Sequence, residues 1–330
     1  MNLITYETPI QKAGKVIPIN ALVATRKIKK FLNAKEPQLV FFLQTIWNNQ
    51  QRAITYKELR EAIIDGYLSE KLMEEWYQDY SRFVIEKVAP MWQDAMKEAN
   101  KAFTEVLGDK YIFNPMQENV VKWTNDRAAA FVTNVTQDQI KALREVIKRA
   151  TQLNDMNVDE LSRAIRPMVG LDWRQAIANQ NYYNTLIENG VKARDALEKS
   201  IKYSARQNRY RAYRIARTEL AHSYNYGAYA GSKQAQAQGL LGKCVKVWSC
   251  ASDERVCDIC GQLEGTEIGM DDDFYYKNQH GNQTRINPKL SDPIMGRIGT
   301  AHPGCRCTVM YKEIEPPLQT DNTPNIVIDN

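Results

Sequence analysis

The first 243 residues of this 330-residue chain contain no cysteine, and the chain has no long apolar run. Runs such as residues 39–43 are far shorter than the roughly 20 apolar residues that cross a bilayer, so we expect no transmembrane helix and no membrane anchor. The first nine residues lack the charged and apolar segments of a signal peptide, so we expect synthesis and use in a cytoplasm. The net charge is only +5, so only a local concentration of charge would indicate binding to nucleic acid.

The composition excludes two further classes of protein. Hydrophobic residues make up 43% of the chain and charged residues 25%, with 16 glycines and 12 prolines. These values are typical of globular proteins and not of collagenous or wholly disordered chains. The length allows a sizeable core and roughly two domains. We therefore expect an ordered protein with more than one region.

Helical patterns follow one another up to about residue 240. After Ser69, apolar residues recur at steps of three and four as far as Gly108, which predicts one long amphipathic element with a kink at Pro90. Its apolar face consists of Leu72, Trp76, Tyr80, Phe83, Met91 and Phe103. The same periodicity from Lys192 to about Gln236 predicts one or two further helices. Their expected inward residues are Leu197, Ile201, Ala205, Ala212, Ala216 and Leu220.

Three capping boxes mark expected helix starts in the centre of the chain. In this motif the cap side chain and the side chain three positions later each accept a hydrogen bond from the other residue's backbone N–H group. The three boxes are Thr136-x-x-Gln139, Asn157-x-x-Glu160 and Asp172-x-x-Gln175. The helix that starts after Asp172 is expected to end at Gly190.

The pattern changes beyond residue 240. β-branched and aromatic residues predict one short strand at residues 245–248 and another at residues 308–311. About sixty residues rich in glycine, asparagine, aspartate and proline lie between them, and a loop of that length needs a staple to stay ordered. Residues 313–330 contain three prolines and few apolar side chains, so we expect a flexible tail.

The expected fold is therefore mainly α. Multi-helix N-terminal and central regions would precede a small, loop-rich α+β module that carries five of the six cysteines and two of the three histidines. We place a helical N-terminal domain at residues 1–155, a helical core at 156–245, the Cys/His module at 246–312 and the tail at 313–330.

Five potential metal ligands form two clusters in this module. Cys257-x-x-Cys260 places two thiols on one turn, a spacing that grips one face of a tetrahedral ion. Some forty residues later, His302, Cys305 and Cys307 supply an imidazole and two more thiols. A reducing cytoplasm disfavours disulfides, so the pattern predicts a structural zinc site of the Cys₃His or Cys₄ type.

The ligand set stays open because five donors compete for four positions. One of the last two cysteines is a bystander, or a full set of thiolates displaces the histidine. In the alternative interpretation the last two cysteines are ordinary buried residues and the Cys-x-x-Cys pair is free or oxidisable. The convergence of donors in two clusters favours zinc. Cys244 and Cys250 are not at ligand spacing, so we interpret them as packing thiols.

A local concentration of positive charge lies in the predicted helix from Lys192 to Arg217, where nine lysines and arginines oppose two acids. Four of the nine follow each other at steps of three and four, with tyrosines interleaved. This basic stripe consists of Lys199, Lys202, Arg206 and Arg209. It suits contacts with nucleic-acid phosphates without sequence preference. The alternative is a solvated face, or a face packed against an acidic partner.

The last third of the chain carries an ordered series of motifs. The series is Ala216-Arg217-Thr218-Glu219, Trp248, Asp253-Glu254-Arg255-Val256-Cys257-x-x-Cys260, Leu263-x-Gly265 and Ala301-His302-Pro303-x-Cys305-Arg306-Cys307. It resembles the Mu F-like minor head proteins of tailed bacteriophages, the phage head morphogenesis family. Residues 170–176 with Asn181-Tyr182 resemble an upstream motif of that family, so the resemblance covers about residues 155–312. The chain departs from the family at residues 298–301, where members often carry prolines.

The resemblance implies a minor capsid protein that is present in few copies and is not an enzyme. Its implied partners are the phage portal protein, a major capsid or scaffolding protein and packaged double-stranded DNA. It would act in procapsid assembly, DNA packaging or DNA ejection, in the host cytoplasm during assembly and later inside the capsid near the portal. Residues 1–155 would contact portal or capsid, and residues 156–245 would form the core of the Mu F-like domain.

The alternative function is a zinc-stapled nuclease that acts on DNA. His280, Asn282 or Asn287, and His302 would then hold a catalytic metal near the two thiol pairs. Against this, His302 would have to leave the zinc, and no second histidine lies nearby in the sequence to polarise water. We therefore expect no catalytic residues.

Overall fold

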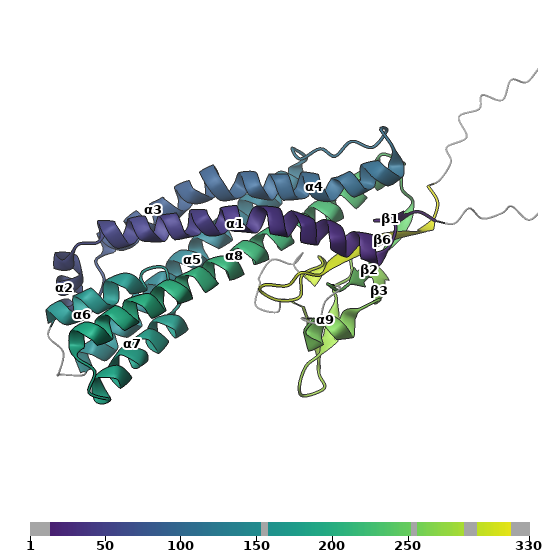
Figure 1. Cartoon of the computed structure of the whole chain (residues 1–330). Coiled ribbons are helices and arrows are strands. Elements are labelled where there is room, and N and C mark those ends of the chain that lie inside the picture. Colours follow the sequence, from purple (N-terminus) through teal and green to yellow (C-terminus); the bar gives the residue numbers. More distant parts are fainter. Residues whose placement is uncertain (1–13, 153–157, 252–255, 287–295, 318–330) are drawn as a thin grey trace, which may run out of the picture.

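The computed structural model of the chain describes residues 14–152, 158–251, 256–286 and 296–317. Long helices dominate it, and a small sheet with its loops lies beside one end of the helical bundle (Figure 1). The predicted mainly α fold is confirmed. None of the described helices combines the length and the apolar character that crossing a membrane requires.

The helices are α1 (Ala21–Ala53), α2 (Tyr56–Asp65), α3 (Glu70–Phe83), the π-helical turn η1 (Val84–Val88), α4 (Ala89–Leu107), α5 (Glu118–Gln152), α6 (Val158–Ile165), the 3₁₀ turn η2 (Arg166–Met168), α7 (Trp173–Glu188), α8 (Ala193–Ala237) and α9 (Asp258–Leu263). The strands are β1 (Val16–Ile17), β2 (Lys243–Ser249), β3 (Glu267–Gly269), β4 (Tyr275–Lys277), β5 (Gln283–Arg285) and β6 (Thr308–Glu315).

The long amphipathic element predicted between Ser69 and Gly108 is confirmed. The side chain of Ser69 caps α3 by accepting a hydrogen bond from the N–H group of Leu72 at 3.3 Å, and α4 ends at Gly108. The π-helical turn η1 ends at Val88, two positions before Pro90. Proline lacks an N–H group and its ring crowds the preceding turn, so the predicted kink takes the form of a locally widened helix.

The capping box at Asp172 is confirmed. Its carboxylate accepts from the N–H group of Gln175 at 3.0 Å, and the Gln175 side chain accepts from the N–H group of Asp172 at 3.2 Å. Helix α7 ends beside Gly190, which adopts a left-handed φ of +79°. The box predicted at Asn157 begins outside the described residues.

The helix start predicted at Thr136 is wrong, because Thr136 lies inside the continuous helix α5. Gln139 is fully buried, where its side chain accepts from the Tyr80 hydroxyl at 2.7 Å and donates to Gln50 at 3.2 Å. A glutamine that bonds to two other helices cannot also cap its own. The motif therefore marks a buried polar contact and not a boundary.

Helix α8 packs against α1, α4 and α7, and it is the central element of the fold (Figure 1). Its close approach to α4 depends on two glycines. A Cβ atom at Gly227 would lie 2.4 Å from the Cα of Met96, and one at Gly231 would lie 1.8 Å from the Oδ1 of Asn100. The side-chain amide of Asn100 also donates to the backbone carbonyl of Gly227 at 2.9 Å. The side chain of one helix therefore lies directly against the backbone of the other.

The predicted inward face of α8 is correct in its second half and wrong in its first. Ala212, Ala216 and Leu220 are buried, whereas Ile201 and Ala205 are exposed. The buried residues of the first half are Ala196, Ser200, Ser204, Asn208 and Arg211. The polar members of this set bond to α7, to η2 and to the turn between them, so this face is held by hydrogen bonds that a hydropathy pattern does not report.

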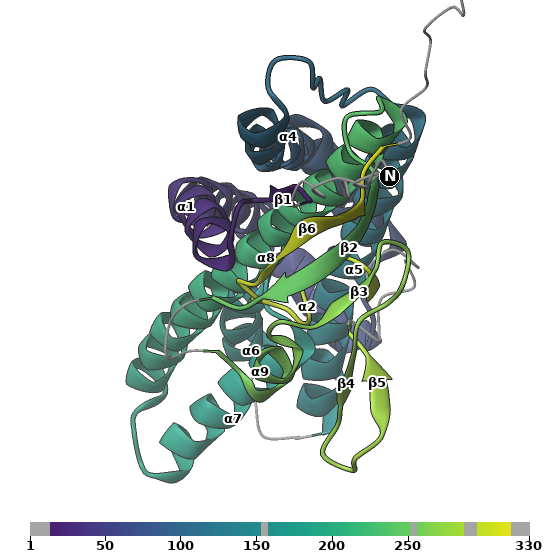
Figure 2. The same cartoon turned by 90° about the vertical axis from the view of Figure 1, so that its right-hand side faces the viewer.

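Both predicted strands are confirmed. They form β2 and β6, which pair antiparallel in a sheet of order β1-β6-β2-β3 (Figure 2). Strand β6 continues to Glu315, so it enters the segment predicted to be a tail. The buried Glu313 explains this, because it accepts from the N–H group of Gly242 at 2.7 Å and pairs with Lys15. The predicted tail from residue 318 onward lies outside the described residues.

One core cluster joins helices from the first 155 residues to α8, to the sheet and to buried thiols. It includes Phe31 of α1, Trp92 of α4, Leu220 of α8 and Cys305. A second cluster contains side chains of α2, α5, α6 and α7. The boundaries predicted at 155/156 and 245/246 stay predictions, and side chains from both sides of each share the first core.

Candidate metal centre

Cys257 and Cys260 lie at the start of α9. Cys257 is the residue before the first helical turn and Cys260 lies three positions later, so the two thiols lie on the same side of this turn. The sulfur of Cys257 is 3.1 Å from the Nε2 atom of His302, and that of Cys260 is 3.4 Å from it. The two predicted halves of the site therefore meet at this histidine.

A tight turn holds His302 and Cys305. The N–H group of Cys305 donates to the carbonyl of His302 at 3.1 Å, with Pro303 and the left-handed Gly304 (φ +78°) between them. Proline followed by a left-handed glycine is the pattern of a type II turn. The Nδ1 atom of His302 lies 3.0 Å from the carbonyl of Pro303, which can only accept. The tautomer with its proton on Nδ1 satisfies this contact and presents the lone pair of Nε2 to the thiols, as a metal ligand requires.

The five predicted donors form two groups that share Cys260. The first contains Cys257, Cys260 and His302, and the second contains Cys260, Cys305 and Cys307; within each group the donor atoms lie within 4.8 Å of one another. The sulfurs of Cys260 and Cys305 are 3.7 Å apart. Two thiolates on a tetrahedral zinc would be about 3.8 Å apart, given Zn–S bonds of about 2.3 Å. The residues present therefore fit a zinc ion, which would cross-link α9 to the segment before β6.

Hydrogen bonds among the buried thiols single out Cys305. The bonds that it receives from Cys260 and Cys307 hold the pKa of its thiol well below the usual range. Metal ions bind thiolates and not thiols, so a cation bound among these thiols would take the place of the protons in their hydrogen bonds.

Cys250 also belongs to this neighbourhood, although its spacing in the sequence gives no sign of it. Ser249 of β2 pairs with Thr308 of β6, so Cys250 and Cys307 are opposite each other at the next position. The Cys250 thiol donates to the carbonyl of Cys260 at 2.9 Å, and its hydrogen bond to the Cys307 thiol is the first cause of the raised pKa of Cys307. The register of the two predicted strands was the signal that could have found it.

Helix α8 fixes the position of the loop that carries the later donors. The N–H group of Gly304 donates to the Thr218 hydroxyl at 2.8 Å. The fully buried Asn225 donates to the carbonyl of Cys307 at 3.1 Å and accepts from the Thr308 hydroxyl at 2.7 Å. Two polar side chains of one helix thus hold both ends of this loop.

The chain was compared with known protein families, with curated proteins and with solved structures. A family model described as Phage Mu protein F like protein matches residues 157–310. The predicted resemblance to the Mu F-like family is confirmed over these residues. The matched segment includes α8 and every donor of the metal centre. No curated protein and no solved structure gives a significant match to the chain.

The Mu F-like motif at residues 216–219 connects three parts of the molecule. Arg217 donates two hydrogen bonds of 2.8 Å to Glu36 of α1. The Thr218 hydroxyl accepts a hydrogen bond from the N–H group of Gly304 in the loop of the metal centre. Glu219 accepts two hydrogen bonds from Arg127 of α5, one of them at 2.9 Å, and both of these residues are buried. The motif is therefore a structural hub that joins α1, α5 and the metal loop to α8.

The upstream Mu F-like motif at residues 170–176 also serves packing. Gly170 has a left-handed φ of +90°, and a Cβ atom there would lie 2.6 Å from the ring of Trp47 on α1. Its carbonyl accepts from Arg211 of α8 at 2.7 Å. Gly170 therefore lets the chain pass closely between α1 and α8. The acidic motif at residues 253–255 lies outside the described residues.

All four residues of the basic stripe are exposed on α8, and none of them forms an ion pair within the described part of the chain. Arg206 lies 5.9 Å from the ring centre of Tyr203, and Arg209 lies 5.9 Å from that of Tyr213. The arginines at positions 211, 214 and 217 are paired with acids of α5, of the α7 cap and of α1. Charge on this helix therefore divides into a paired inner set and an outward stripe.

Proposed function

We propose that this chain is a minor head protein of a tailed bacteriophage. The observation that carries the proposal is the Mu F-like segment at residues 157–310, whose motifs hold the fold together. The protein would be part of the virion, near the portal, and would act in procapsid assembly and in DNA packaging or ejection. Its partners would be the portal protein, a major capsid or scaffolding protein, and packaged double-stranded DNA.

The metal centre supports a structural and not a catalytic role. Structural zinc sites are closed by four protein ligands rich in thiolate, whereas catalytic sites keep a position open. Cys260, Cys305 and Cys307 are all buried. His280 and His302 line one open groove, as the nuclease alternative requires, but the Nε2 atom of His302 faces two thiols and would be used by the zinc. Asn287 lies outside the described residues.

The N-terminal helices offer a surface for the portal. Phe41 of α1 is 64% exposed and Ile85 of η1 is 71% exposed. When the chain is co-expressed with the portal protein of the same phage, we expect the two to co-purify, and we expect the Phe41→Ser/Ile85→Ser variant to recover at least about tenfold less portal protein. The matched control is Ile187→Ser/Ile201→Ser, which alters two exposed residues of the Mu F-like segment. Absence of portal protein from the unmodified chain would contradict the proposed association.

The basic stripe is proposed to contact DNA phosphates. Replacing Lys199, Lys202, Arg206 and Arg209 with glutamine removes four cations that have no ion pair to lose within the described residues. We expect the slope of log affinity for duplex DNA against log salt concentration to fall by about three to four, since each phosphate contact contributes about 0.9. A control with the same charge change replaces lysines on the N-terminal helices, namely Lys57, Lys71, Lys97 and Lys101. Equal slopes for the stripe variant and the unmodified chain would show that the stripe is only a solvated face.

A further inference from the structure

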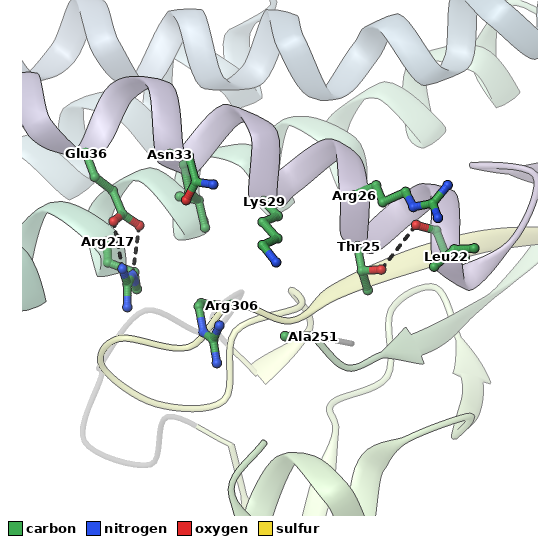
Figure 3. A pocket seen from close by; sticks show the side chains of 10 residues that line it. Leu22, Thr25, Arg26, Lys29, Asn33, Glu36, Arg217, Ala251 and Arg306 are labelled. Carbon is green, nitrogen blue, oxygen red and sulfur yellow. Dashed lines mark hydrogen bonds and ion pairs between the residues drawn. The ribbon is translucent and has the colours of Figure 1, made fainter. Parts of the chain in front are cut away.

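We propose that a pocket between α1, α8 and the metal loop, which comprises residues 302–307, binds a phosphate group. The pocket has a volume of about 290 Å³, and four cationic side chains are among its lining residues (Figure 3). They are Arg26, Lys29, Arg217 and Arg306. Lys29 extends from α1 towards Arg306, while Arg217 lies against Glu36, the only acid among the described lining residues.

The cations come from three segments that are far apart in the sequence. Arg26 and Lys29 are three positions apart on α1 and so share one face of the helix. Arg217 of α8 is fixed by its two 2.8 Å hydrogen bonds to Glu36, which is only 4% exposed. Arg306 lies in the metal loop between two buried cysteines. The fold, including the metal centre, therefore holds these charges around one cavity.

The charges around this cavity do not balance within its described lining. The carboxylate of Glu36 pairs with Arg217, and no other acid is among the described lining residues. Neighbouring like charges repel each other, so an anion placed between them is stabilised. Arg26 and Lys29 form no ion pair in the described parts of the chain. The arginines at 217 and 306 have contacts with the protein, and the five N–H donors of a guanidinium can serve protein and ligand together.

The shape and lining of the pocket select the chemical class of the anion. A volume of about 290 Å³ is at the lower limit of pockets that enclose drug-sized ligands. No aromatic ring is among its described lining residues, so these residues provide no surface on which a base could stack. Guanidinium groups match the oxygens of phosphate in pairs, and Asn33 adds an amide at the rim. The pocket therefore suits one phosphate group, either free or in a DNA backbone.

The first experiment measures binding of inorganic phosphate to the full-length, metal-loaded protein. We expect phosphate to raise the melting temperature relative to chloride at equal ionic strength, and Arg26→Gln/Lys29→Gln to weaken calorimetric affinity at least about tenfold. Both residues are exposed, so this variant should match the unmodified chain in chloride. The control Lys30→Gln/Lys97→Gln loses the same charge outside the pocket and should stay within about twofold. Failure of phosphate to bind, or equal weakening in the two variants, would overturn the proposal.

A second measurement identifies the source of the phosphate group. If a DNA backbone supplies it, the salt slope for duplex DNA should fall by about one in Arg26→Gln/Lys29→Gln, since one phosphate contact is lost. An unchanged DNA slope together with lost phosphate binding would assign the pocket to free phosphate. Only this DNA measurement rests on the proposed function, so a failure of that function leaves the phosphate result interpretable.

Discussion

The Cys260→Ser variant is expected to lose its metal ion and more than about 4 kcal/mol of its free energy of unfolding. Cys260 is the donor that the two groups of the metal centre share, and it is 2% exposed. Binding of a structural ion contributes directly to folding, because the site does not exist in the unfolded chain. Apolar side chains of the segment between β2 and β6, such as Leu263 and Phe274, are buried, and the metal ion would add a cross-link to this packing.

Metal content and urea unfolding, each with and without a chelator, measure this effect. Chelation should bring the unmodified chain to the stability of Cys260→Ser and should leave the variant unchanged. The matched control is Cys244→Ser, which makes the same atomic change at a thiol that is 4% exposed in β2 and belongs to neither donor group. This control should keep its metal. A Cys260→Ser protein that keeps the ion and unfolds within about 1 kcal/mol of the unmodified chain would contradict a metal centre at this position.

Two further serine variants test whether the donor group that includes His302 holds the ion. Cys257→Ser should release the ion, because Cys257 belongs to the group that includes His302. Cys250→Ser should keep it, because Cys250 reaches the centre only through hydrogen bonds to Cys307 and to a backbone carbonyl. The opposite result would place the ion among the buried thiols, with Cys250 as a ligand and without His302.

Features that depend on near neighbours could be predicted from the sequence. The caps at Ser69 and Asp172 each need only the residues of one helical turn, and both are present. The pairing of thiols with an imidazole also followed from residue type, because few other arrangements use these side chains at such spacing. The structure brings all five predicted donors together for that reason.

The failures have one physical cause, which is that the same local pattern can serve a distant partner. Thr136-x-x-Gln139 has the form of the box at Asp172, yet Gln139 bonds to Tyr80 and Gln50 across the bundle. The first half of α8 buries serines and Arg211 because carbonyls of other segments accept from them. Hydropathy and motif spacing contain no information about such partners.

The hub at residues 216–219 shows the same limit for function. The resemblance identified the motif, but its partners Glu36 and Arg127 lie about 90 to 180 positions away in a region without a recognised family pattern. The contacts give the motif a physical purpose, because they attach the N-terminal helices to the Mu F-like segment.

Breaking the buried pair of this hub is expected to be almost as damaging as removing the metal. Arg127 is 8% exposed and Glu219 is 5% exposed, and two hydrogen bonds join them. The Arg127→Met variant leaves a buried carboxylate without its cation, which typically costs about 3–5 kcal/mol. Urea unfolding at neutral pH measures the loss. The control Arg194→Met breaks an exposed pair with Glu198 on the same helix, α8, and should cost less than about 1 kcal/mol.

A double variant separates the buried charge from lost packing. Arg127→Met/Glu219→Leu removes both charges, so it should recover most of the stability lost in Arg127→Met, and recovery of about 2 kcal/mol or more would give the pair a clear coupling energy. If the double variant is as unstable as the single one, the loss comes from packing and not from an unpaired charge.

Because the pair joins α5 to α8, the single variant should also split one unfolding transition into two if residues 1–155 fold separately. One cooperative transition in every variant would mean that the residues on both sides of the predicted boundary at 155/156 unfold as a single unit.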